Sequence, residues 1–245
     1  MLDRPAIKQE ARTLNRAAGR SVIIAALIYL SVIFLLQSAS TYASGDFVNY
    51  MRQAAPEMPI PPILIHEPYP RSIVIFVSFF TMLLSFVLGA GWRLFLLEVR
   101  RGEHPSYGTL LDGFAFAGKL IVLNLLIRLF VILWSALFVI PGIIAWYRYR
   151  FAVYNLCENP DISVTEALNM SKAQTYGHKS ELFVLDLSFL GWFVVSLAAF
   201  YVPLLWVAPY YMQTDIGYFQ RIKREKGVGL LSETDSRDPF DPENR

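Results

Sequence analysis

Charged residues are scarce in this chain of 245 residues. Only 17% of the residues are charged, whereas 55% are hydrophobic. A typical soluble domain has roughly 25% charged residues. The apolar residues are also gathered into runs that approach the roughly 20 residues needed to cross a bilayer core of about 30 Å. The composition therefore argues against an ordinary soluble domain and predicts an all-α, multi-pass membrane bundle whose main partner is the lipid bilayer.

Cysteine, clustered histidines and catalytic motifs are equally scarce. The single cysteine, Cys157, excludes an internal disulfide and a multi-cysteine metal site, and we expect a small apolar packing residue there. The three histidines, His66, His104 and His178, lie far apart and outside the apolar runs. The chain has no His-Glu-x-x-His motif, no Gly-x-Ser-x-Gly motif and no glycine-rich phosphate loop. We therefore expect no enzymatic activity, no cofactor and no metal.

The apolar runs divide residues 1–226 into a single membrane domain with six predicted spans. Basic residues crowd both ends of this domain. Because cytoplasmic flanks are rich in Lys and Arg, both ends are expected inside a bacterial cell, which requires an even number of spans. The basic blocks lack interleaved aromatic residues, so nucleic acid is not an expected partner. The spans are expected near 21–38, 73–97, 120–138, 141–157, 182–200 and 203–220.

The segments that flank these spans differ in character. Residues 1–20 place Ile7, Ala11 and Leu14 on one side, which predicts an interfacial amphipathic helix. Such a long basic segment favours an uncleaved anchor over a signal peptide for the first span. Residues 227–245 have the polar composition of a flexible tail.

The region around Pro141 and Gly142 allows two interpretations. One long helix kinked at Pro141 would cross the membrane once, whereas a turn at Pro141 and Gly142 would make a tight hairpin. The hairpin places Lys172 and Lys179 on the cytoplasmic side, so the positive-inside rule favours it. Arg150 then lies within a span, where a charge is expensive unless it is paired or hydrated.

Shorter segments connect the spans. Six prolines in residues 56–70 predict a stiff, extended connector. Apolar residues at helical spacing over 107–114 predict an interfacial helix on the cytoplasmic surface. Ser163 followed by Glu166 fits a capping box, which predicts a short helix over 164–176.

Two parts of the sequence are similar to each other. Residues Gly118–Leu125 and Gly177–Leu187 each contain a glycine and a lysine, followed by Leu-x-Val-Leu-Asn/Asp-Leu. Each part continues to a proline turn, which in the second part is at Pro203 and divides the last apolar run. The similarity indicates either a duplicated unit of surface helix plus hairpin or a chance likeness between leucine-rich spans. A duplication would make Asp186 the counterpart of Asn124.

Several short motifs, taken together, resemble one bacterial family of integral membrane proteins, known as domain of unknown function 975. The matching motifs are Ile140–Ile144, Asn159–Pro160, Glu166–Leu168 with Ser171, Gly177–Lys179, Leu185–Trp192 and Pro209–Tyr210. This chain departs from the family in the stretch before Pro203, where a glycine-containing turn is usual, and at Tyr218–Phe219, which reverses the usual Phe-Tyr. The resemblance implies a multi-span bundle and assigns no activity. A more distant likeness is to the membrane domain found beside some glycerophosphodiester phosphodiesterases.

Asp186 is the most conspicuous polar residue, because it lies within an apolar run. It is expected either to be a buried carboxylate paired with Arg128 or Arg150, or to be a proton or cation relay. In the second case Asn124, Arg128 and Arg150 would line a polar cavity with it.

These alternatives lead to two functional hypotheses. The first is a non-enzymatic membrane scaffold or accessory protein, with other membrane proteins or anionic lipids as candidate partners. The second is a small transporter or lipid-handling protein built around the Asp186 cluster. The oligomeric state is left open by the sequence.

Overall fold

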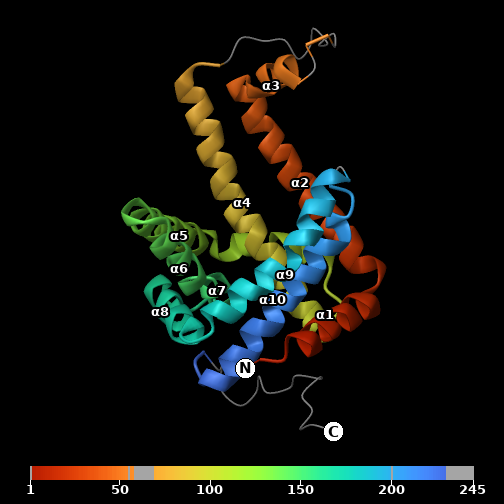
Figure 1. Ribbon diagram of the computed structural model, residues 1–245, viewed down its shortest axis with the longest axis vertical. Coiled ribbons are helices and arrows are strands. Elements are labelled where there is room, and N and C mark those ends of the chain that lie inside the picture. The colour runs from red at the N-terminus through yellow and green to blue at the C-terminus, as the bar shows by residue number, and fades with distance from the viewer. Residues whose placement is uncertain (1, 55, 58–68, 200, 230–245) are drawn as a thin grey trace.

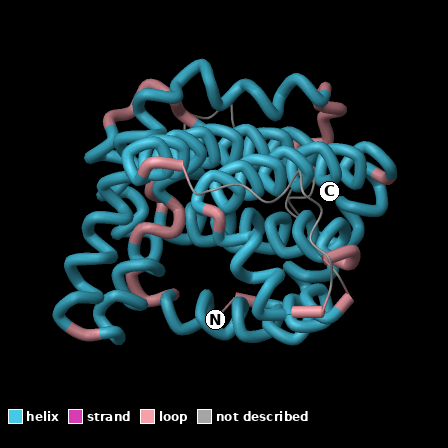
Figure 2. Tube along the Cα trace, turned by 90° about the horizontal axis from the view of Figure 1, so that it is seen from above, coloured by secondary structure: helices cyan, strands magenta, loops and turns pink. Residues whose placement is uncertain are grey.

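The computed structural model describes residues 2–54, 56–57, 69–199 and 201–229, and these form helices without any β-strand (Figures 1 and 2). Most of the connector predicted over 56–70, and residues 230–245 of the predicted tail, lie outside the described residues. The helices are α1 (Arg4–Ala18), α2 (Arg20–Ser44), α3 (Asp46–Ala54), α4 (Arg71–Arg100), the 3-10 helix η2 (Tyr107–Phe116), α5 (Ala117–Leu137), α6 (Val139–Arg148), α7 (Ala152–Glu158), α8 (Val164–Thr175), α9 (Lys179–Ala198) and α10 (Leu204–Lys226).

Helix α1 is amphipathic and packs on α10. Asp3 caps its first turn by accepting a hydrogen bond from the amide of Ala6. Ile7, Ala11 and Leu14, the apolar side predicted from the sequence, are buried within the protein, and the location of α1 at the membrane interface stays a prediction. Gly19 adopts a positive φ of 56°, a conformation that glycine tolerates best, and thereby separates α1 from α2.

Helices α2 and α4 form a long antiparallel pair that extends away from the rest of the protein and meets α3 at its far end (Figure 1). Near that end Ser40 and Ser78 share a hydrogen bond of 2.8 Å, and near the other end Tyr29 stacks on Trp92. Four segments are long and apolar enough to cross a membrane: α2, α4, Tyr107–Leu137 and α9. Many of their large apolar side chains are exposed, as expected for surfaces that face lipid.

The chain reverses direction between α5 and α6, which lie side by side. The reversal takes place at Phe138, where the backbone is extended, and not at Pro141 and Gly142 as the sequence suggested. Pro141 lies instead in the first turn of α6, which tolerates proline because the amides there have no helical partner. Gly142 packs so closely on Ser135 that a β-carbon would overlap it.

The span predicted over 141–157 is wrong as a single helix. The segment forms α6, with 10 residues, and α7, with 7 residues, separated by a corner at Tyr149–Phe151. The last predicted span falls within α10, which begins after Pro203 and continues without a break. Neither segment is among the four helices that are long and apolar enough to cross a membrane, so a total of six spans stays a prediction.

The α5–α6 hairpin and the α9–α10 hairpin bury corresponding positions. Pro141 and Pro203 are 62 positions apart, as are Asn124 and Asp186. The same offset joins the buried residues of the two first helices. These are Leu120, Leu123 and Ile127 in α5, and Leu182, Leu185 and Phe189 in α9. The agreement in burial favours duplication over a chance likeness between leucine-rich segments.

The core lies where α7, the second half of α10 and the end of α4 meet. Trp92 and Phe95 stack on one another within α4. Phe151, Tyr154 and Phe219 form a second aromatic group, with ring centroids 5.3 to 6.2 Å apart. This core holds the corner at Tyr149–Phe151 against α10, and that corner positions the polar site.

Candidate functional site: a buried ion network between two hairpins

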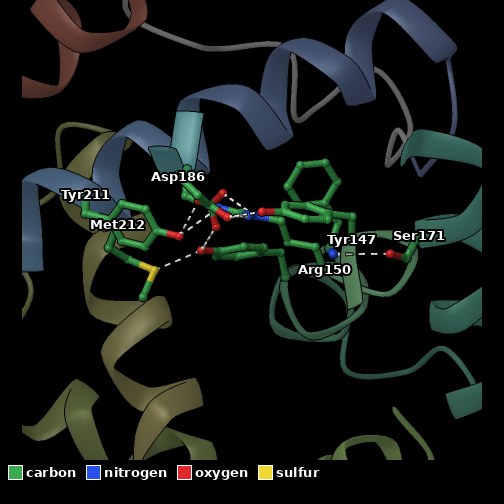
Figure 3. A network of polar contacts seen from close by, with 9 residues as sticks. Tyr147, Arg150, Ser171, Asp186, Tyr211 and Met212 are labelled. Carbon is green, nitrogen blue, oxygen red and sulfur yellow. Dashed lines mark hydrogen bonds and ion pairs between the residues drawn. The ribbon is translucent and has the colours of Figure 1, made fainter. Parts of the chain in front are cut away.

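Arg150 occupies the corner between α6 and α7. Ser171 of α8 fixes this corner, because its hydroxyl accepts a hydrogen bond from the amide of Phe151 (Figure 3) and also donates one to the carbonyl of Arg148. Thr175, one turn further along α8, donates to the same carbonyl. The first hairpin is thereby fastened to α8 at the point from which the Arg150 side chain extends.

The guanidinium of Arg150 binds two carboxylates on the second hairpin. Its Nη1 and Nη2 atoms lie 2.7 and 2.8 Å from the two oxygens of Asp186 on α9, in a bidentate pair. Its Nε atom donates to Asp215 on α10 at 2.8 Å. The side chain of Arg150 is only 7% exposed. Arg150 therefore links the α6–α7 corner to both helices of the α9–α10 hairpin.

Both oxygens of Asp186 are fully used. Oδ1 accepts from Arg150 and from the hydroxyl of Tyr211, and Oδ2 accepts from Arg150 and from the hydroxyl of Tyr147 (Figure 3). A carboxylate has about four lone-pair sites, so these four hydrogen bonds satisfy it. Multiple donors of this kind stabilise the ionised form of a carboxylate.

Asp215 is the second carboxylate of the network, and sequence reasoning missed it. Its Oδ2 atom accepts a hydrogen bond of 2.8 Å from Tyr154 on α7, and its side chain is 7% exposed. The available signal was its position four residues after Tyr211, which places both side chains on one face of a helix. A buried carboxylate without a partner would cost free energy. An acidic residue on this helix face therefore predicts a basic partner elsewhere in the chain.

A second arginine balances the charges. The guanidinium of Arg93 on α4 lies over the ring of Tyr154 at 5.5 Å and donates to the carbonyl of Gly89. Because Tyr154 in turn contacts Asp215, the two arginines and two aspartates form one connected group of zero net formal charge. The network therefore joins α4 and both hairpins.

Two of the four predicted cluster residues lie outside this network. Arg128 is exposed, with its guanidinium 4.7 Å from the ring centroid of Phe86, and it does not form the predicted pair with Asp186. Asn124 donates a hydrogen bond of 2.8 Å to the carbonyl of Leu120 in its own helix. The two proposed counterparts, Asn124 and Asp186, therefore differ in what they bind.

The predicted cap and the second proline have local structural roles. Ser163 accepts from the amide of Glu166, and the Glu166 side chain accepts from the amide of Ser163, so both halves of the capping box are present. Gly177, just beyond α8, has a positive φ of 86°. Pro203 is the N-cap of α10.

Within the described part of the chain, no group of three or more His, Cys, Asp or Glu side chains is placed to hold a metal ion. Cys157 lies in α7, outside the four helices that could cross a membrane. Burial raises the pKa of its thiol to about 12, so the thiol is protonated and unreactive near neutral pH. Cys157 therefore has the properties of a packing residue.

A sequence family described as "Protein of unknown function (DUF975)" matches residues 137–226. The match supports the resemblance to this family over that part of the chain. It begins at the α5–α6 reversal and includes six residues of the network, namely Tyr147, Arg150, Tyr154, Asp186, Tyr211 and Asp215. No curated protein and no solved structure matches the chain significantly, so the likeness to the glycerophosphodiester phosphodiesterase membrane domain has no further support.

Proposed function

We propose that this chain is a non-enzymatic membrane scaffold or accessory protein, in which the Arg150 network locks two helical hairpins together. The observation that supports this role is the saturation of Asp186, which receives four hydrogen bonds from Arg150, Tyr147 and Tyr211. A relay carboxylate must exchange protons or ions along a path. A carboxylate whose acceptor sites are all occupied by fixed protein donors is suited to holding helices in place.

The proposal includes a placement in the membrane. The α2–α4 pair and the two hairpins supply six membrane segments, with both termini in the cytoplasm of a bacterial cell. The returning helix α6 is only about 15 Å long at 1.5 Å per residue, so it reaches about halfway across a bilayer core of about 30 Å. Arg150 and Asp215 then lie on the cytoplasmic side of the apolar layer or are enclosed by protein. Their mutual pairing there avoids the cost of an isolated charge.

Ion flux distinguishes the scaffold from a relay. The purified chain would be reconstituted into liposomes that enclose a pH-sensitive dye, and a potassium diffusion potential would be applied. The scaffold predicts a proton leak equal to that of protein-free liposomes, for the wild type and for Asp186→Asn alike. A leak that is present in the wild type and abolished in Asp186→Asn would overturn the proposal.

A small transporter or lipid-handling protein is the second candidate. One observation favours it: the Asp186 side chain is 28% exposed, in contrast to 7% for both Arg150 and Asp215. Solvent or a ligand would therefore reach the network first at Asp186. The same flux measurement tests proton transport, and exchange of a fluorescent lipid between the leaflets of these liposomes tests lipid movement.

A further inference from the structure

A row of basic side chains follows one face of α1. Arg4, Lys8, Arg12 and Arg16 are spaced four residues apart, so they lie above one another on the helix surface. The opposite face of α1 is buried against α10. No ion pair joins any of these four side chains to a carboxylate within the described residues. We call these four residues the α1 basic row.

The α1 basic row lines an open cleft between α1 and α9. The cleft has a volume of about 900 Å³ and is lined by the whole row together with Ser188 of α9. Asp3 is the one acidic residue among those that line it, and Asp3 is engaged as the cap of α1. Four positive charges therefore face one negative charge around this space.

Contacts with α9 and α10 hold two of the basic side chains in place. Lys8 donates to the hydroxyl of Ser188 at 2.7 Å and lies 4.5 Å from the ring centroid of Phe189. Arg12 donates from Nε to the hydroxyl of Tyr210 at 3.1 Å, while its guanidinium lies over the same ring. These neutral partners orient the cations without neutralising them.

Burial and neighbouring positive charges both disfavour the charged form of Lys8. Partial burial, followed by the nearby charges of Arg12 and Arg4, lowers the pKa of Lys8. An anion bound in the cleft would offset this repulsion between the basic side chains. The cleft is therefore electrostatically suited to a phosphate group.

An apolar track continues from the cleft along α9. Gly191 lies one turn beyond Ser188, and a β-carbon there would meet open space. Trp192 and Val195 follow on the same side of the helix and are 53% and 52% exposed. Because α9 is long and apolar enough to cross a membrane, this track would face acyl chains. Basic groups beside an exposed apolar track match a phospholipid better than they match a free phosphate ion.

We propose that the cleft between α1 and α9 binds the phosphate headgroup of an anionic phospholipid, with Lys8 and Arg12 as its principal ligands. The proposal relies on the proposed placement of α9 in the membrane, and it adds a specific lipid partner to the scaffold. The acyl chains would lie along Gly191, Trp192 and Val195.

Lipid binding by the full-length protein in neutral detergent tests this site, with native mass spectrometry as the readout. The probes are phosphatidylglycerol, phosphatidylcholine and the soluble compound glycerol 3-phosphate. The double variant Lys8→Gln/Arg12→Gln is compared with Arg101→Gln/Lys226→Gln, which removes the same charge from exposed residues outside the cleft. A third variant, Lys8→Arg/Arg12→Lys, keeps the charge.

We expect the wild type to prefer phosphatidylglycerol to phosphatidylcholine. Each basic residue near an anionic lipid headgroup stabilises the bound state. The loss of two such residues should therefore weaken phosphatidylglycerol binding about 30-fold. The matched control and the charge-preserving variant should bind as the wild type does. Shielding of Cys157 from a thiol reagent verifies that each variant is folded, since Cys157 is buried.

Two results would overturn the proposal. In the first, folded Lys8→Gln/Arg12→Gln binds phosphatidylglycerol as tightly as the Arg101→Gln/Lys226→Gln control. In the second, glycerol 3-phosphate displaces the lipid at equal concentration, which would assign the cleft to a soluble phosphate compound. Neither result bears on proton flux, so the lipid site and the scaffold proposal can fail independently.

Discussion

At the scale of single residues, the saturation of Asp186 predicts a large cost for its removal. Asp186→Ala would leave Arg150 with Asp215 as its one carboxylate partner in the described structure. Loss of one partner from a buried ion pair costs about 3 kcal/mol of unfolding free energy or more. For a chain of this length, that cost corresponds to a fall of about 6 to 12 °C in the unfolding midpoint.

The chain offers a matched control for this substitution. Asn124 is the counterpart of Asp186 in the first hairpin, and it bonds only to the carbonyl of Leu120 among the described residues. Asn124→Ala should therefore lower the unfolding free energy by about 1 kcal/mol or less. Unfolding midpoints would be measured by differential scanning fluorimetry. Equal midpoints for Asp186→Ala and Asn124→Ala would show that the Arg150–Asp186 ion pair contributes no more to stability than the single hydrogen bond of Asn124.

Cys157 provides a second prediction at this scale. Because it is buried and the pKa of its thiol is raised to about 12, the folded protein should react slowly with maleimide throughout pH 7 to 9. The unfolded chain should react faster as the pH rises, since an exposed thiol ionises over this range. Rapid labelling of the folded protein at pH 7 would contradict the buried position of α7.

The network also shows what the sequence could and could not predict. Apolar periodicity and the position of Asp186 indicated a buried carboxylate, but Arg128 and Arg150 were equally good partners by depth along their helices. The choice depends on the corner at Tyr149–Phe151, which Ser171 fixes from α8. Such a contact joins residues that are distant in the chain, so no local pattern could identify it.

At the scale of elements, the close packing of η2 on α4 depends on Gly91. A β-carbon at this position would overlap the backbone carbonyl of Leu110, which cannot move as a flexible side chain can. Gly91→Ala should therefore force α4 and η2 apart and cost about 1 to 3 kcal/mol of unfolding free energy.

Gly118→Ala in α5 is the control for this prediction, because a β-carbon at Gly118 would meet no other atom within 4 Å. Alanine in a helix is favoured over glycine, so Gly118→Ala should be neutral or stabilise by up to about 1 kcal/mol. If chemical unfolding shows Gly91→Ala to be as stable as Gly118→Ala, the packing of η2 on α4 is looser than the structure indicates.

The boundaries of the elements could be predicted in part. The long apolar helices and the amphipathic α1 follow from hydrophobic periodicity, which reflects burial directly. The reversal at Phe138 could not be predicted, because Pro141 and Gly142 are stronger turn residues by type. In the folded chain Pro141 instead fits the first turn of α6, and Gly142 makes room for Ser135.

At the scale of the whole molecule, the proposed topology predicts opposite sides for two positions. Tyr50 is 67% exposed on α3, at the far end of the α2–α4 pair, and Thr165 is exposed on α8. With both termini in the cytoplasm, a membrane-impermeant maleimide should label Tyr50→Cys in intact cells. Thr165→Cys should be labelled only after the cells are made permeable.

The native Cys157 is buried and should not interfere with either measurement. Labelling of both introduced cysteines from the same side would exclude the six-segment arrangement. Labelling with the two sides exchanged would keep the segments but reverse the orientation that the basic residues favour.

The central claim is that Arg150 and Asp186 act together to lock the two hairpins, and a double-mutant cycle tests it most directly. Unfolding free energies would be measured for Asp186→Ala, Arg150→Met, the double variant and the wild type, with exposure of Cys157 to a thiol reagent as the readout. We predict a coupling energy of at least about 1.5 kcal/mol, because each single variant removes one partner of the Arg150–Asp186 pair and leaves the other, whereas the double variant removes both. Asp215 loses Arg150 in Arg150→Met and in the double variant alike, so that cost cancels in the cycle. Costs that simply add, with a coupling energy near zero, would contradict the account.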